Sequence, residues 1–156
     1  MIMLMSWFRV YIVAFFGCFL VSCGNRDALE VRQFTLRDTD SAWSDDLMIR
    51  GEIQRHLFGA VEASERELRK GQYYQVRWRA PRSGGPVKVI FRYQQAQTGS
   101  RTQILEKIVS PERDTGVVEF AVNGEAYRDG GRVLAWQAIA EQGGVELGRK
   151  QSFQWQ

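Results

Sequence analysis

The stretch QYYQVRWRA, residues 72–80, decides the fold of this chain because large apolar and polar side chains alternate along it. One parity carries Tyr74, Val76, Trp78 and Ala80, and the other carries Tyr73, Gln75, Arg77 and Arg79. A period of two residues is typical of a β-strand that packs one face against a core and leaves the other in solvent. The stretch therefore predicts a half-buried strand with a basic outward face.

The same pattern recurs toward the C-terminus in short segments that are separated by turn-forming residues. Residues 81–86 (PRSGGP) form a turn cluster, residues 123–131 form a turn-rich bridge, and Gly143-Gly144 favours a two-residue hairpin. The strands predicted in this part of the chain are residues 87–97, 102–109, 117–122, 132–141 and 145–155.

Residues 47–58 (LMIRGEIQRHLF) allow two interpretations. Ile49, Ile53 and Leu57 share one parity, which favours a strand. Helical spacing instead brings Ile53 together with the apolar residues at both ends of the segment. A glycine within the segment and another just after it disfavour a long helix. We therefore expect a strand, with a helix as the alternative.

The segments on either side of residues 47–58 give weaker patterns. Residues 64–70 begin with Ser64 followed three residues later by Glu67, and Gly71 offers a stop, so we expect one charged helical turn or a loop. Leu29–Leu36 is a candidate first strand, and residues 37–46 form a charged loop.

Seven strands are predicted when residues 47–58 are counted and the candidate strand Leu29–Leu36 is not. Short strands joined by turns predict an all-β fold, an antiparallel two-sheet β-sandwich over residues 47–156. The layout resembles immunoglobulin-like and fibronectin-III-like modules in size, strand number and the tryptophan of an early strand. That resemblance implies two packed sheets and no particular functional residue, since the Cys…Trp…Cys framework is absent.

The N-terminal residues read as an export signal. Residues 1–9 carry one positive charge, residues 10–21 are apolar, and the small Ser22 follows. Leu20-Val21-Ser22-Cys23 resembles the bacterial lipobox, in which the cysteine is lipidated and the leader is cut off before it. The resemblance implies a signal peptide over residues 1–22, lipidation of Cys23, and a tether or loop over residues 23–46. The alternatives are an uncleaved membrane anchor and an incidental thiol beside an ordinary cleavage site.

The same resemblance gives the expected location, a lipid-anchored position in the bacterial cell envelope. An Asp after the lipidated cysteine favours retention in the inner membrane, and Gly24 stands there instead. The outer membrane is therefore expected over the inner one. The lipid on Cys23 makes the membrane itself the first partner.

The composition argues against nucleic-acid binding and against disulfide bonds. The chain has 21 Lys and Arg, of which Arg9 leaves with the leader, so 20 remain against 18 Asp and Glu. This near balance predicts no nucleic-acid binding. Cys18 also leaves with the leader and Cys23 is used for lipid, so no disulfide can form and the domain depends on a packed core.

Residue types that usually carry catalysis are scarce. His56 is the one histidine of the chain, and its polar parity predicts a solvated strand position. Neither a zinc site nor a phosphate-binding or dinucleotide-binding glycine motif is present, so we expect no metal and no cofactor. The acidic loop does not follow the calcium-loop pattern, with Trp43 in place of the glycine and Ile49 in place of the closing glutamate. The acids of that loop are Asp38, Asp40, Asp45 and Asp46.

These observations predict a non-enzymatic binding or structural module that contacts another envelope protein or a cell-wall glycan. Edge strands such as residues 145–155 and the loops at the sandwich ends are the expected contacts. The alternative is a hydrolase that uses two carboxylates among Glu106, Glu119 and Glu125 on cell-wall or carbohydrate substrates. The residues of outward parity on two predicted strands form a candidate contact surface, made of Tyr73, Arg77, Arg79, Lys88 and Arg92. The alternative is that these residues are simply the solvated face of a sheet.

Overall fold

The protein is a two-layer β-sandwich. The structure is a computed structural model that describes residues 28–37 and 46–155. One sheet (sheet A) has the order β1-β2-β5, and the other (sheet B) has the order β4-β3-β6-β7. Their bounds are β1 Leu29–Leu36, β2 Gly71–Arg79, β3 Val87–Gln95, β4 Gln103–Val109, β5 Thr115–Asn123, β6 Val133–Gln142 and β7 Val145–Gln151. Every neighbouring pair is antiparallel, which confirms the predicted all-β, antiparallel two-sheet sandwich.

Aromatic side chains from both sheets fill the space between them. Tyr74, Phe91 and Phe120 are at most 1% exposed, and the Phe91 ring centroid lies 4.5 Å from that of Tyr74 and 5.4 Å from that of Phe120. Gly116 lies opposite Trp78 in the β2–β5 register, and a Cβ atom there would overlap the Trp78 indole. The core thus depends on the absence of a side chain at residue 116.

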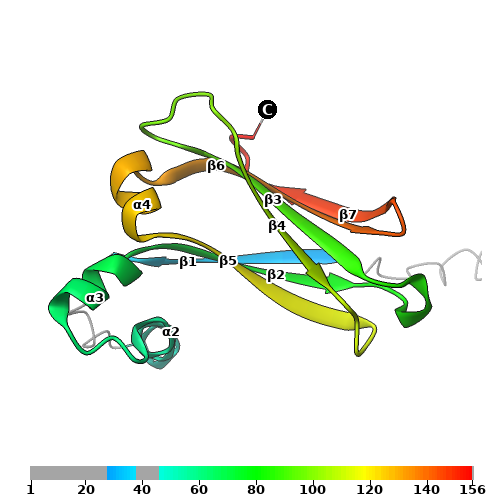
Figure 1. Ribbon diagram of the computed structural model, residues 1–156, viewed down its shortest axis with the longest axis horizontal. Helices are drawn as coiled ribbons and strands as arrows, with labels where there is room; N and C mark the ends of the chain where they lie inside the picture. Colours follow the sequence, from blue (N-terminus) through cyan, green and yellow to red (C-terminus); the bar gives the residue numbers. More distant parts are fainter. Residues whose placement is uncertain (1–27, 38–45, 156) are drawn as a thin grey trace, which may run out of the picture.

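The strand pairings place the loops at two opposite ends of the sandwich. At one end, which we call the entry end, the Arg79 amide donates to the Ala28 carbonyl over 2.9 Å. The loops 80–86, 110–114 and 143–144 lie at this same end because they join strands whose ends pair there. The other end carries α2 (Leu47–Leu57), α3 (Ala63–Arg69) and α4 (Gly124–Gly130) (Figure 1).

Residues 47–57 form the helix α2, so the predicted strand is wrong and the alternative is correct. The Asp46 side chain caps the helix by accepting from the Met48 amide over 2.8 Å. The strand that pairs with β2 at one edge is β1, over the whole range Leu29–Leu36. The sandwich therefore begins at Leu29, before the predicted boundary at residue 47.

Two more helices lie where the sequence predicted a charged helical turn or loop (residues 64–70) and a turn-rich bridge (residues 123–131). Helix α3 is capped by Glu62 and Glu65, whose side chains bond reciprocally to the backbone, so the capping box lies two residues before the predicted one. The bridge at residues 123–131 contains the helix α4, which ends where the Gly131 amide donates to the Tyr127 carbonyl over 2.9 Å. Between β2 and β3 lies the short 3-10 turn η3 (Arg82–Gly84).

Within the described residues, none of the helices has the length and apolar character needed to cross a membrane.

Candidate functional site

Helix α2 packs on the outer face of sheet A rather than on the main core. Ile53 is 4% exposed and joins a second apolar cluster with Leu36 of β1 and Tyr73 of β2. Phe34 and Leu57 pack against its rim. Tyr73 is therefore covered by the helix, and its 5% exposure removes it from the predicted contact surface.

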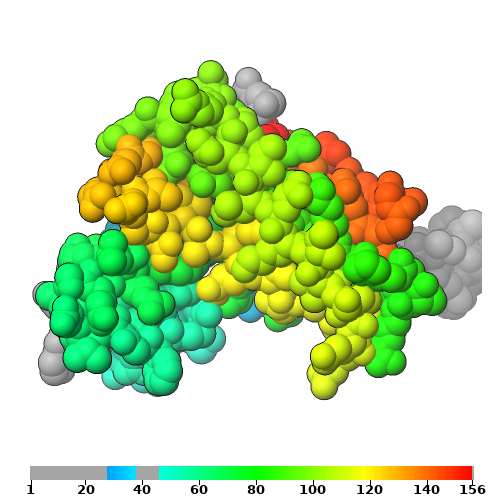
Figure 2. All heavy atoms as spheres, in the orientation of Figure 1, coloured from blue at the N-terminus to red at the C-terminus, as the bar shows by residue number. Residues whose placement is uncertain are grey.

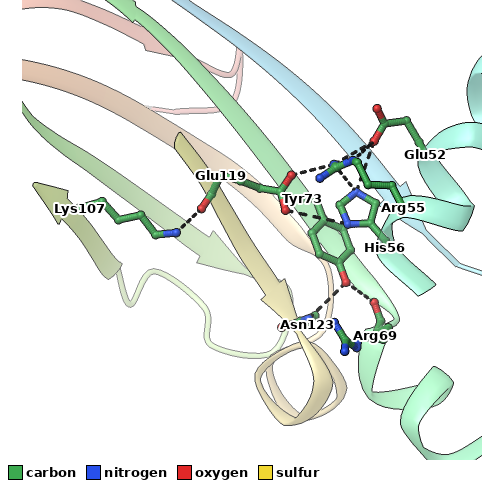
Figure 3. Close-up of polar contacts among 8 residues, drawn as sticks. All are labelled: Glu52, Arg55, His56, Arg69, Tyr73, Lys107, Glu119 and Asn123. Atoms are coloured by element: carbon green, nitrogen blue, oxygen red, sulfur yellow. Dashed lines mark hydrogen bonds and ion pairs between the residues drawn. The ribbon is translucent and has the colours of Figure 1, made fainter. Parts of the chain in front are cut away.

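His56 lies inside this second cluster. Its ring stacks on Tyr73 at a centroid distance of 3.7 Å (Figure 3) and on Phe34 at 5.2 Å. The residue is 6% exposed. The predicted solvated strand histidine is wrong because α2 is a helix, in which residue 56 follows Ile53 by three positions and shares its buried face.

Arg55 ties α2 to sheet A through Glu119 of β5 and also contacts Glu52 and His56 of its own helix. Its Nη2 atom lies 2.9 Å from Glu52 Oε2 and 2.7 Å from Glu119 Oε2. The same atom lies 2.8 Å from His56 Nε2 (Figure 3). A guanidinium group can only donate, so His56 Nε2 accepts and the imidazole proton is assigned to Nδ1. That nitrogen faces Glu119 Oε1 at 4.0 Å.

Burial and charge both favour a neutral His56. Burial lowers the pKa of His56 below its usual 6.5, and Arg55 lowers it further, while Glu119 and Glu52 act in the opposite direction. Burial raises the pKa of Tyr73, whose hydroxyl donates to the Arg69 carbonyl over 2.5 Å. The cluster is thus a neutral aromatic stack, and Arg55 donates to both His56 and Glu119 at its border.

The arrangement of Arg55, Glu52, Glu119 and His56, which we call the α2 latch, fastens two distant segments of the chain. The Arg55–Glu119 bond joins residues 64 positions apart. The backbone carbonyl of Glu119 accepts a hydrogen bond from Lys107 Nζ of β4 over 2.6 Å (Figure 3). The same ammonium lies 5.6 Å from the Phe120 ring centroid. The latch can hold α2 in one orientation on sheet A. Sequence reasoning missed it because it depends on the helix.

The basic residues of the predicted contact surface do not form one surface. Arg77 and Arg79 lie on the outer face of sheet A, whereas Lys88 and Arg92 lie on the outer face of sheet B. The two outer faces of a sandwich point in opposite directions, so a shared outward parity on β2 and β3 does not place residues together. Lys88 pairs with Glu106 over 3.0 Å instead.

The acids of the alternative hydrolase are likewise separated. Glu106 pairs with Lys88 on sheet B, and Glu119 pairs with Arg55 on sheet A. Glu125 belongs to α4 and lies 3.8 Å from Arg128. The structure brings no two of these three carboxylates to one cleft.

The remaining predicted sites fall partly outside the described residues. Leu20, Val21, Ser22 and Cys23 lie outside them, as do Asp38, Asp40 and Asp45. Asp46 serves as the cap of α2. Across residues 28–37 and 46–155, no three His, Cys, Asp or Glu residues are grouped so that they could hold a metal ion.

A pocket of about 580 Å³ lies at the entry end, between β1 and the last strands. Val31, Trp78 and Trp136 supply apolar walls, and Arg77 and Lys150 are among the polar residues that line it. The predicted contact strand at residues 145–155 corresponds to β7, which ends at Gln151 on the border of this pocket. Its volume is within the range of small-ligand sites.

Comparison with known proteins shows a likeness in architecture. A solved structure of an immunoglobulin-like protein from Pseudomonas aeruginosa is similar to this chain, with 16% sequence identity and a TM-score of 0.37. The match covers 52% of this chain and 69% of that chain. No family model and no curated protein match the sequence.

Proposed function

We propose that this chain is a lipid-anchored, non-catalytic binding module of the bacterial cell envelope. The observation that carries the proposal is the lipobox Leu20-Val21-Ser22-Cys23 at the end of an apolar leader. The first strand of the immunoglobulin-like sandwich begins at Leu29, soon after this lipobox. A lipid on Cys23 would hold the sandwich at the bilayer, since two or three acyl chains on one residue give lasting attachment.

The distance between anchor and domain is short. Six peptide units join Cys23 to Leu29, and a fully extended chain spans at most about 3.6 Å per residue, so the entry end stays within roughly 20 Å of the anchor. The partner must therefore be a component of the envelope that reaches the membrane surface. The candidates are another envelope protein and a cell-wall glycan.

The outer face of sheet B offers the surface for that partner. Ile104 and Ile108 of β4 are 54% and 71% exposed. Both share the outward parity of Lys88 and Arg92, with which they pair. Apolar side chains surrounded by charged ones are typical of protein interfaces, so we favour another envelope protein over a glycan.

The anchoring is tested by Cys23→Ala, with Cys18→Ala as the matched control because residue 18 lies within the leader. We expect labelled palmitate to enter wild-type protein and Cys18→Ala but not Cys23→Ala, which accumulates as the uncleaved precursor. The mass of the N-terminal peptide gives an independent reading. Normal processing of Cys23→Ala would refute the anchor.

The partner surface is tested by photo-crosslinking in cells. A crosslinker at residue 108 probes sheet B, and one at Val117, which is 54% exposed on the outer face of sheet A, serves as the control. We expect a discrete protein adduct from residue 108 that residue 117 does not give. Equal adduct patterns from both positions would contradict the assignment to sheet B.

A further inference from the structure

The helical segment carries an unusual share of the exposed apolar surface. Of the twelve large apolar side chains that are exposed among the described residues, six lie between residues 47 and 68. These six are Leu47 (75% exposed), Met48 (80%), Ile49 (45%), Phe58 (85%), Val61 (81%) and Leu68 (51%).

The most exposed of these side chains share one side of α2. Ile53 and His56 face sheet A, and at 100° per residue Leu47, Met48 and Phe58 fall on the opposite side of the helix axis. Gly51 lies between them on that side, with nothing within 4 Å of where its Cβ would be. We call the side that carries Leu47, Met48, Gly51 and Phe58 the outward side of α2.

The outward side of α2 points in the same direction as the outer face of sheet A, since the helix packs on that face with its other side. Helices α2 and α3 protrude at this end of the molecule (Figure 2). The outer face of sheet A also presents the basic side chains of Arg32, Arg77 and Arg79 against the acids Glu30 and Glu119. The Arg32 side chain is 66% exposed and that of Arg77 is 55% exposed.

The anchor would lie at the other end of this same surface. The entry end, which is nearest Cys23, is joined to the α2 end by the eight residues of β1. At about 3.3 Å per residue, that strand spans roughly 25 Å. A sandwich that lies with sheet A along a bilayer would thus touch it at both ends, through the lipid at one and through α2 at the other.

We propose that the outward side of α2 and the arginines of sheet A dock onto the surface of an anionic phospholipid bilayer. Leu47, Met48 and Phe58 enter the boundary between headgroups and acyl chains, and the guanidinium groups pair with lipid phosphates. Sheet B, with Ile104 and Ile108, then faces away from the membrane. The inference rests on the proposed lipid anchor, because the anchor supplies the high local concentration that so few apolar side chains need.

A single-cysteine probe tests the docking in the acylated protein. In mature protein Cys23 is blocked by lipid and Cys18 is gone, so Phe58→Cys or Ile108→Cys provides one thiol for a polarity-sensitive fluorophore. The labelled proteins are reconstituted into phosphatidylethanolamine vesicles with phosphatidylglycerol. We expect lipid-borne quenchers to act on the probe at residue 58 at least about threefold more strongly than on the probe at residue 108.

The lipid charge and a second pair of variants make the test specific. Vesicles of phosphatidylcholine alone should reduce the quenching at residue 58, since the arginines then lose their anionic partners. For a probe at Leu47, which lies on the outward side of α2, the exposed pair Met48→Ser and Phe58→Ser should abolish quenching, whereas Ile104→Ser and Ile108→Ser should leave it unchanged. Circular dichroism establishes that each variant is folded.

Equal, water-like behaviour of the probes at residues 58 and 108 would overturn the docking. A probe at residue 58 that stays in water in vesicles but is shielded in native envelopes would assign α2 to a protein partner and would also refute the bilayer proposal. The mass of the N-terminal peptide separates the two proposals. Acylated protein with an aqueous residue 58 refutes the docking alone, whereas protein without acyl chains refutes the anchor.

Discussion

The substitution Ile53→Ala should loosen α2 from sheet A while leaving the sandwich folded. Ile53 is 4% exposed and contributes the central apolar contact of the helix with Leu36 and Tyr73. The change removes three carbon atoms, which at about 0.8 kcal/mol for each buried methylene amounts to roughly 2.4 kcal/mol. A cavity that does not collapse adds to this figure, and buried Ile→Ala changes cost about 2–5 kcal/mol.

The main core between the two sheets should lose little stability from Ile53→Ala. The cluster around Ile53 is separate from the one between the sheets, so α2 can detach before the sandwich unfolds. Hydrogen exchange should therefore accelerate in residues 48–57 while the amides of β2 and β6 stay protected. Urea denaturation that is followed by tryptophan fluorescence should show a smaller change, because Trp78 lies in the other cluster.

Met48→Ala is the matched control, because Met48 belongs to the same helix and is 80% exposed. Surface substitutions of this kind usually change stability by less than about 0.5 kcal/mol. The reasoning would be refuted if Ile53→Ala accelerated exchange in α2 no more than Met48→Ala does.

Three further outcomes follow from the structure and the sequence. Burial and Arg55 lower the pKa of His56 in the folded protein, so the unfolded chain binds the extra proton first as the pH falls. The free energy of unfolding should therefore fall as the pH drops below 6.5, by at most about 1.4 kcal/mol per pH unit from this one group. The urea midpoint of His56→Gln should fall less over the same pH range than that of the wild type. Gly116→Ala should cost about 1–3 kcal/mol by thermal denaturation, because the new methyl group overlaps the Trp78 indole, and an unchanged midpoint would contradict the packing described. Gly24→Asp should shift the acylated protein toward the inner membrane in a density gradient, and an unchanged distribution would remove the argument for the outer membrane.

The sequence predicted the sandwich because alternation is strong wherever one strand face meets the core. Residues 71–79 and 87–95 are strands as expected, and Tyr74, Trp78 and Phe91 are buried as expected. The structure has seven strands, as predicted, but residues 47–58 are not one of them. The seventh strand is the candidate Leu29–Leu36 and not residues 47–58, because a short apolar run fits either period and pairing is decided by distant residues.

The α2 latch could not be predicted for the same reason. Once residues 47–57 are helical, His56 moves from the solvated parity of a strand to a buried helix face, and Tyr73 loses its exposure to the helix that covers it. The separation of Arg77 from Lys88 has a different cause. Parity assigns a side chain to the outside of its own sheet, but the sequence does not state which strands share a sheet.

The position of Lys107 has a consequence for association between copies. It lies on β4, which is an outermost strand of sheet B, and its side chain reaches across to the Glu119 carbonyl of the other sheet. An unpaired edge strand can pair with the same strand of a neighbouring copy and continue the ladder of backbone hydrogen bonds. An inward-pointing ammonium would have to lose its water in such a pairing, so we expect Lys107 to disfavour edge-to-edge association through β4.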